Sequence, residues 1–204
     1  HAVRLRQRGG LRTAVDQPFL DARAEQYFAI DRPGFVWSVR LTMKGLPIAG
    51  RDAYLDGHGR MLIAAGALWP IVDARGDKID QGSLLRFLGE LIWFPSAALA
   101  PYLRWQAIDE RTAEVTMTHA GVSASARFTF DDEGRVIGFA ARRYLGGAAD
   151  ARLEDWQATC SEWARFDEIE VPVRGVVTWK LAAGDFDYYR WQLTALEYDQ
   201  PRRW

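Results

Sequence analysis

Arginine and glutamate stand four residues apart in the segment LLRFLGELIWFP, as Arg86 and Glu90. A carboxylate beside a guanidinium can act as a general acid or base whose pKa the cation tunes. The same spacing is typical of an exposed helical ion pair, which contributes only about 0.3–0.5 kcal/mol. Trp93 shares their polar stripe, and an indole rarely faces open water. The pair is therefore either a solvated surface feature or part of a cavity lining, and Trp93 favours the cavity.

The apolar residues around this pair have the period of a helix over residues 83–94. They cover about half of the helix circumference, which indicates a face that packs against a sheet. Ser83 is placed to cap the N-terminus, and Pro95 to end the helix. The apolar face consists of Leu84, Leu85, Phe87, Leu88, Leu91, Ile92 and Phe94.

Elsewhere apolar and polar residues alternate, which is typical of antiparallel strands with one buried face. The segment GFVWSVRLTMKG alternates in this way, and glycines at 57, 59, 121 and 134 mark hairpin turns. The basic start VRLRQRGGLR is expected to be an edge strand with a solvated cationic face. We predict a single domain over residues 1–204 with an α+β, predominantly antiparallel β fold. About nine to eleven strands form a curved sheet or half-barrel, with one main helix on its concave face.

Composition excludes several classes of function. A net charge of −1 across 204 residues argues against nucleic acid as a partner. No apolar run approaches the roughly 18 residues of a membrane helix, so no transmembrane segment is expected. We expect a cytoplasmic protein, although a start at His1 is compatible with an upstream targeting or anchoring segment. Aromatic residues make up 13% of the chain, which favours a large core or an aromatic-lined cavity.

The histidines and the cysteine favour no metal site. His1, His58 and His119 lie far apart and show no metal-ligand spacing. The phosphate- and nucleotide-binding glycine motifs do not occur, so no cofactor is expected. His58 is predicted to be a solvated turn residue, and Cys160 a small core residue. An inward-pointing His119 is either a hydrogen-bonded core residue or a catalyst.

Arg143 shares the parity of Phe139 and Ala141, which predicts that it points inward. A buried guanidinium is costly without a partner. The candidate partners are Glu162, Glu197 or the anionic group of a ligand. Aromatic residues of matching parity in the later strands form either a packed core or a pocket; these are Trp156, Trp179, Tyr189 and Trp191.

The order of motifs along nearly the whole chain resembles a bacterial family of proteins of unknown function. The shared features are Gly10 with Arg12, Phe35 with Trp37, Tyr54 with Gly57 and Gly59, Arg86 with Glu90 and Pro95, Trp105, the FTFDDEGRV hairpin at 128–136, and Arg143 or its neighbours. Such proteins resemble lipoprotein carriers of the LolA/LolB type. That resemblance implies an open β-barrel, capped by helices, that holds acyl chains.

The function predicted from these features is binding of a hydrophobic or amphipathic, lipid-like small molecule in an aromatic-lined cavity. The predicted ligand-binding residues are Trp37, Tyr54, Arg86, Glu90, Trp93, Trp105 and Arg143. One alternative is a cofactor-free lyase, isomerase or hydrolase, in which Glu90 is the general base and Arg86 or Arg143 stabilises negative charge. Another is an interaction module whose aromatic residues all belong to the core.

Overall fold

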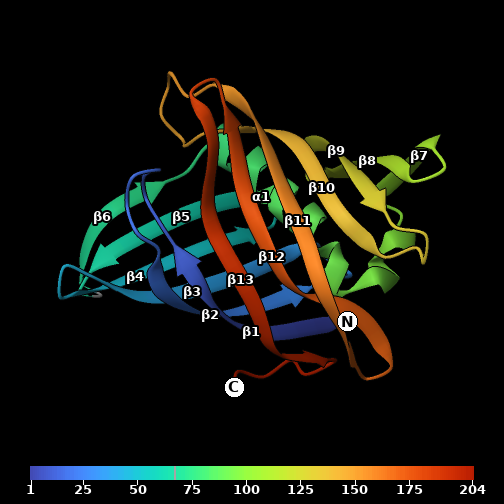
Figure 1. Cartoon of the computed structure of the whole chain (residues 1–204), viewed down its shortest axis with the longest axis horizontal. Coiled ribbons are helices and arrows are strands. Elements are labelled where there is room, and N and C mark those ends of the chain that lie inside the picture. The colour runs from blue at the N-terminus through green and yellow to red at the C-terminus, as the bar shows by residue number, and fades with distance from the viewer. Residues whose placement is uncertain (67) are drawn as a thin grey trace.

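The structure is a computed structural model that describes residues 1–66 and 68–204. Thirteen antiparallel strands form one continuous sheet, which curls around helix α1 (Asp77–Gly89) as a half-barrel (Figure 1). This confirms the predicted fold class. Two short 3-10 helices, η1 (Glu90–Trp93) and η2 (Pro95–Leu99), follow α1. The strands are β1 (Ala2–Leu11), β2 (Leu20–Ala29), β3 (Gly34–Met43), β4 (Leu46–Leu55), β5 (His58–Ala65), β6 (Trp69–Ala74), β7 (Leu103–Asp109), β8 (Thr112–His119), β9 (Val122–Phe130), β10 (Val136–Tyr144), β11 (Leu153–Phe166), β12 (Ile169–Leu181) and β13 (Gly184–Tyr198).

The strand count exceeds the predicted nine to eleven because weakly patterned segments also pair. In β2 the inward positions include two alanines, which give little apolar contrast along the sequence. In β6 the strand is only six residues long and contains Pro70, which is tolerated because β6 lies at the edge of the sheet.

The prediction that β1 is an edge strand is wrong. The strand order is β6-β5-β4-β3-β2-β1-β13-β12-β11-β10-β9-β8-β7, so β1 lies at the centre of the sheet. Its cationic face is also not fully solvated. Arg4 is buried, its Nη2 lies 2.6 Å from Glu197 Oε2, and its guanidinium stacks on the ring of Trp204. The alternation of apolar and polar residues shows that a strand has one buried face. It does not show whether the strand pairs with one neighbouring strand or with two.

Helix α1 begins six residues before the predicted start at 83. Gly76, with φ 103°, precedes the helix, and Asp77 and Asp80 lie in its first turn, where carboxylates favour the positive end of the helix dipole. Ser83 is therefore a buried interior residue and not the cap. The α-helix also ends at Gly89 and continues as a 3-10 turn to Trp93. The first turn contains only Ile79 as a large apolar residue. The apolar period of the sequence therefore begins after this turn, and it predicts a helix start that is too late.

The helix lies on the concave side, where it bridges two distant parts of the curled sheet. It contacts β4 and β5 on one side and β8, β9 and β10 on the other. The backbone of β5 lies against the helix at Gly59. A Cβ added at this position would lie only 2.6 Å from the carbonyl oxygen of Ile79, so the contact requires glycine. The Gly59 N–H donates to Asp80 Oδ1 at 2.6 Å. The second glycine of the YxxGxG hairpin thus permits the close approach of α1.

We expect Leu88→Ala and Leu91→Ala each to lower the free energy of unfolding by about 2–5 kcal/mol, because both side chains are buried under the sheet. Leu99→Ala is the matched control, since Leu99 is 93% exposed and its loss should cost less than about 0.5 kcal/mol. Urea unfolding followed by circular dichroism measures all three. Equal small effects at the three positions would contradict this packing of the helix.

Candidate functional site

Arg86 and Glu90 form the centre of a buried polar cluster between the helix and the sheet. Arg86 Nε lies 2.9 Å from Glu90 Oε1, and Arg86 Nη1 lies 2.7 Å from Asp52 Oδ2 on β4. Gln26 on β2 donates from Nε2 to Glu90 Oε2 at 2.7 Å and accepts from Arg86 Nη2 at 3.3 Å. The side chains of Arg86 and Glu90 are only 14% and 12% exposed. The exposed-pair alternative is therefore excluded.

Burial and charge oppose each other in this cluster. Burial raises the pKa of Glu90, and the charge and hydrogen bond of Arg86, with the hydrogen bond of Gln26, offset only part of that rise. Burial alone would lower the pKa of Arg86, but the carboxylates of Glu90 and Asp52 outweigh it and raise that pKa. Both carboxylate oxygens of Glu90 accept hydrogen bonds from protein groups. This is the arrangement of an anchored ion pair, not of a general base with a free oxygen.

Of the other predicted residues, Trp37 joins this cluster. The Arg86 guanidinium lies 4.5 Å from the centre of the Trp37 ring, and Tyr189 makes an edge contact with the same ring. Tyr54 is fully buried, and its hydroxyl lies 2.9 Å from His119 Nδ1. His119 is thus a hydrogen-bonded, half-buried residue, and burial, only partly opposed by Asp56, lowers its pKa.

Trp93 and Trp105 lie apart from the Arg86 cluster. Trp93 is 3% exposed, donates its indole N–H to the carbonyl oxygen of Pro172, and packs edge-on against Trp191. Trp105, on the edge strand β7, packs against Phe128 and donates to the carbonyl oxygen of Ala98. The inference that Trp93 indicates a cavity beside Arg86 and Glu90 is not supported, because its indole packs in the core.

Arg143 lies on the concave side, as its parity predicts, but neither predicted carboxylate reaches it. Glu162 pairs with Arg174, and Glu197 pairs with Arg4. The guanidinium instead lies over the rings of Trp156 and Trp179, at 4.8 Å and 5.9 Å from their centres. Arg143 thus belongs to a second site on the helix-facing side of β10.

Sequence reasoning missed Asp52 and Gln26, which complete the Arg86 cluster. Each is a polar residue at an inward position of an otherwise apolar alternation: Asp52 shares the parity of Tyr54, and Gln26 that of Phe28. A polar residue at such a position was the available signal, since it needs a buried partner.

The concave face is only partly covered by the helix. In β3 the inward side chains Phe35 and Val39 are buried, whereas Leu41 and Met43 are only half-buried. Met43 pairs with Leu46, and the row from Leu41 leads through Ile48 and Ala65 to Trp69. At this far end Leu46 is 60% exposed and Trp69 is 77% exposed. A row of apolar side chains on the helix-facing side therefore ends in solvent.

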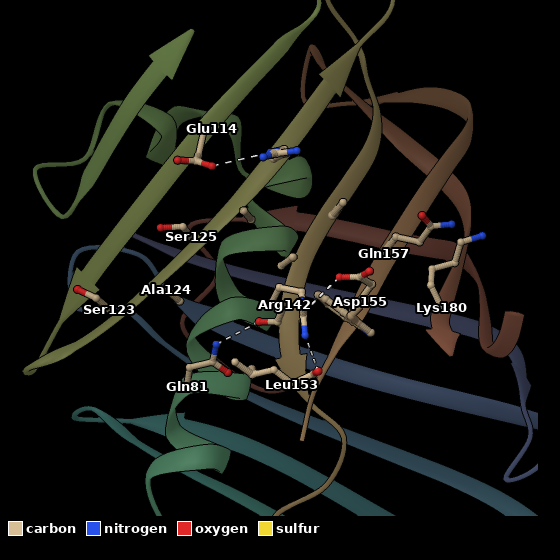
Figure 2. Close-up of a pocket in the computed structure, with 15 residues that line it drawn as sticks. Gln81, Glu114, Ser123, Ala124, Ser125, Arg142, Leu153, Asp155, Gln157 and Lys180 are labelled. Atoms are coloured by element: carbon tan, nitrogen blue, oxygen red, sulfur yellow. Dashed lines mark hydrogen bonds and ion pairs between the residues drawn. The ribbon is translucent and has the colours of Figure 1, made fainter. Parts of the chain in front are cut away.

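A depression of about 810 Å³ lies on the opposite, convex face of β8 to β12 (Figure 2). Its lining mixes apolar side chains such as Leu153 with charged ones, which form ion pairs between Arg142 and Asp155 and between Arg127 and Glu114. The side chain of Gln81 donates to the carbonyl oxygen of Arg142 at its border. None of the seven predicted ligand-binding residues lines it.

Residues 1–66 and 68–204 contain neither a metal-binding cluster nor a membrane-spanning helix. No group of three or more His, Cys, Asp or Glu side chains there is arranged to hold a metal ion. No helix in the same ranges combines the length and the apolar character that crossing a membrane requires.

The fold of the chain is similar to the folds of two solved structures. It is similar to a putative outer membrane lipoprotein-sorting protein domain from Vibrio parahaemolyticus, with a TM-score of 0.53, 10% identity, and coverage of 99% of this chain and 87% of that one. It is also similar to a LolA superfamily protein from Nitrosomonas europaea, with a TM-score of 0.52, 12% identity, and coverage of 98% and 86%. At these identities the likeness concerns the fold alone.

Residues 1–191 match the model of a family of unknown function, DUF6544, and the chain belongs to that family. This confirms the resemblance drawn from the order of motifs. A comparison with curated proteins gives no match.

Removal of Arg86 should show how much stability is lost when the carboxylates of Glu90 and Asp52 are buried without a counter-charge. Methionine keeps the packing on Trp37 but not the charge, so we expect Arg86→Met to lower the free energy of unfolding by about 3–5 kcal/mol. Adding Glu90→Gln, which can still hydrogen-bond to Gln26, should recover part of that loss because one unpaired charge disappears. Chemical unfolding of both variants measures this. Additive destabilisation in the double variant would contradict the coupling.

The Arg86→Met variant should also differ in its pH dependence. Without Arg86 the main interaction opposing the raised pKa of Glu90 is lost. A carboxyl with a raised pKa in the folded state contributes stability below its unfolded pKa and loses it as pH rises through the folded pKa. The difference in unfolding free energy between wild type and variant should therefore be smaller near about pH 5 than near about pH 8. A difference that does not change with pH would contradict a buried, unpaired Glu90.

Proposed function

We propose that this protein binds a hydrophobic or amphipathic, lipid-like small molecule, whose apolar part lies on the uncovered end of the concave face. The observation that carries the proposal is the row of inward apolar side chains that emerges from under the helix and ends at Leu46 and Trp69. Exposed apolar surface that continues a buried core is typical of ligand-binding or interaction sites.

Energetics favour an apolar ligand at this position. Covering a large apolar side chain stabilises a complex by about 1.5–3 kcal/mol relative to leaving it in water. Leu41, Met43 and Leu46 lie together at one end of the β3–β4 hairpin, so one alkyl chain can cover several of them. The similar structure from Vibrio parahaemolyticus is described as lipoprotein-sorting, a name that refers to lipid-bearing proteins and supports a ligand of this class.

The proposal can be tested by two substitutions on adjacent residues of β3 that face opposite sides of the sheet. Leu41→Glu places a charge on the concave face, whereas Thr42→Glu places one on the exposed convex face. We expect the first to weaken binding of the neutral apolar probe N-phenyl-1-naphthylamine about tenfold or more, equivalent to about 1.4 kcal/mol, and the second to change it little. Fluorescence titration measures both.

A second measurement identifies natural ligands. Organic extraction of the purified protein, followed by mass spectrometry, should recover amphiphiles from wild type and less from Leu41→Glu. If the probe binds neither wild type nor control, or binds Leu41→Glu as well as it binds Thr42→Glu, the concave face is not the ligand site.

A further inference from the structure

We propose that Arg143, together with the hydroxyl of Tyr188, binds the anionic head group of the ligand. The inference rests on the proposed lipid-like function and names the charge of its ligand. Arg143 is half-buried on the concave side of β10, where its guanidinium lies over Trp156 and Trp179. These aromatic faces hold the cation at a fixed place beside apolar surface.

The guanidinium of Arg143 forms no direct ion pair with the described residues, and Glu154 is its cross-strand partner on β11. Among residues 1–66 and 68–204, no carboxylate lies within ion-pair distance of its guanidinium. Its cross-strand neighbour Glu154 makes no ion pair with it either. Arg86, the other arginine between the helix and the sheet, faces two carboxylates. A partly desolvated cation without a counter-charge attracts an anion more strongly than a solvated surface arginine does.

The helix is shaped to accommodate this guanidinium. A Cβ at Gly82 would lie 3.1 Å from Arg143 Nε, so glycine leaves the space that the side chain occupies. Glycine inside a helix is less favourable than alanine. Gly82 therefore lowers helix stability where α1 lies against Arg143.

Tyr188 supplies a second donor beside the same indoles. Its hydroxyl accepts the N–H of Trp156 at 3.1 Å, and its ring packs against Trp179. Within the described part of the chain, the Tyr188 O–H donates to no acceptor, so its proton is available to an anionic oxygen. Phe186 extends the half-buried aromatic surface next to Tyr188. Two donors and an adjoining apolar surface suit a carboxylate or phosphate monoester attached to an alkyl chain.

The test compares three ligands of equal chain length: tetradecanoic acid, tetradecyl phosphate and methyl tetradecanoate. Each is titrated against the neutral naphthylamine probe bound to the protein. With wild type we expect the acid or the phosphate to bind at least about tenfold more tightly than the ester. The ratio of acid to phosphate affinity identifies which anionic group the site prefers.

Two arginine variants test whether Arg143 causes the preference for anionic ligands over the ester. Arg143→Gln should reduce binding of the anionic ligands to the level of the ester and leave ester binding unchanged. Arg142→Gln is the matched control, because Arg142 is the next residue on β10 but pairs with Asp155 on the convex face. It should retain the preference. Tyr188→Phe keeps the ring and removes the O–H donor, so it should weaken the anions severalfold without affecting the ester.

The outcomes distinguish failure of the assignment to Arg143 from failure of the proposed lipid binding. Equal binding of acid, phosphate and ester by wild type would overturn the assignment to Arg143 while supporting lipid binding. A preference for anions that persists in both Arg143→Gln and Tyr188→Phe would overturn it as well. If neither the probe nor any of the three ligands binds, the proposed function fails first. If Arg143→Gln does not fold, Arg143→Lys, which keeps the charge, and Tyr188→Phe carry the test.

Discussion

The architecture depends on one geometrical mismatch: a helix of thirteen residues has to cover the apolar face of thirteen strands. Such a helix is about 20 Å long, whereas strands spaced by about 4.8 Å make a sheet roughly 60 Å wide. The sheet reduces the mismatch by curling, so that β4 and β5 approach the helix from one side and β8 to β10 from the other. Curling does not remove the mismatch between the helix and the sheet completely. The apolar row beyond Leu41 stays outside the helix, and this is the surface on which the proposed function rests.

The two arginines between the helix and the sheet, Arg86 on α1 and Arg143 on β10, show how one residue type serves two purposes. Arg86 is held by Asp52, Glu90 and Gln26, so its charge is satisfied and it ties α1 to both β2 and β4. Buried ion pairs of this kind add little net stability, but the separate partners fix where the helix lies. Arg143 has aromatic neighbours and no carboxylate in the described part of the chain. A satisfied cation positions the helix, and an unsatisfied one remains available to a ligand.

Local patterns predicted much of this molecule, and long-range pairing explains what they missed. The alternation in β3 correctly placed Trp37 on the helix side, and the parity of Arg143 predicted its concave position. The start of α1 was missed because its first turn carries mostly polar residues. The buried state of Arg86 could not be read from helical periodicity, because its partners Asp52 and Gln26 come from strands distant in sequence. For the same reason, no local pattern shows that Glu162 and Glu197 form ion pairs with other arginines.

The position of β1 has a consequence for how the chain folds. Its pairing with β13 forms the central seam of the sheet, from Val3 opposite Tyr198 to Leu11 opposite Tyr189. This seam joins segments separated by nearly the whole described sequence, whereas every other pairing in the sheet joins consecutive strands, so closing the seam carries the largest loop-closure entropy. During synthesis the β1–β2 hairpin must wait, with one backbone edge unpaired, until β13 has emerged. An intermediate in this state exposes both an open strand edge and apolar surface, the combination that makes nascent β-rich chains dependent on chaperones.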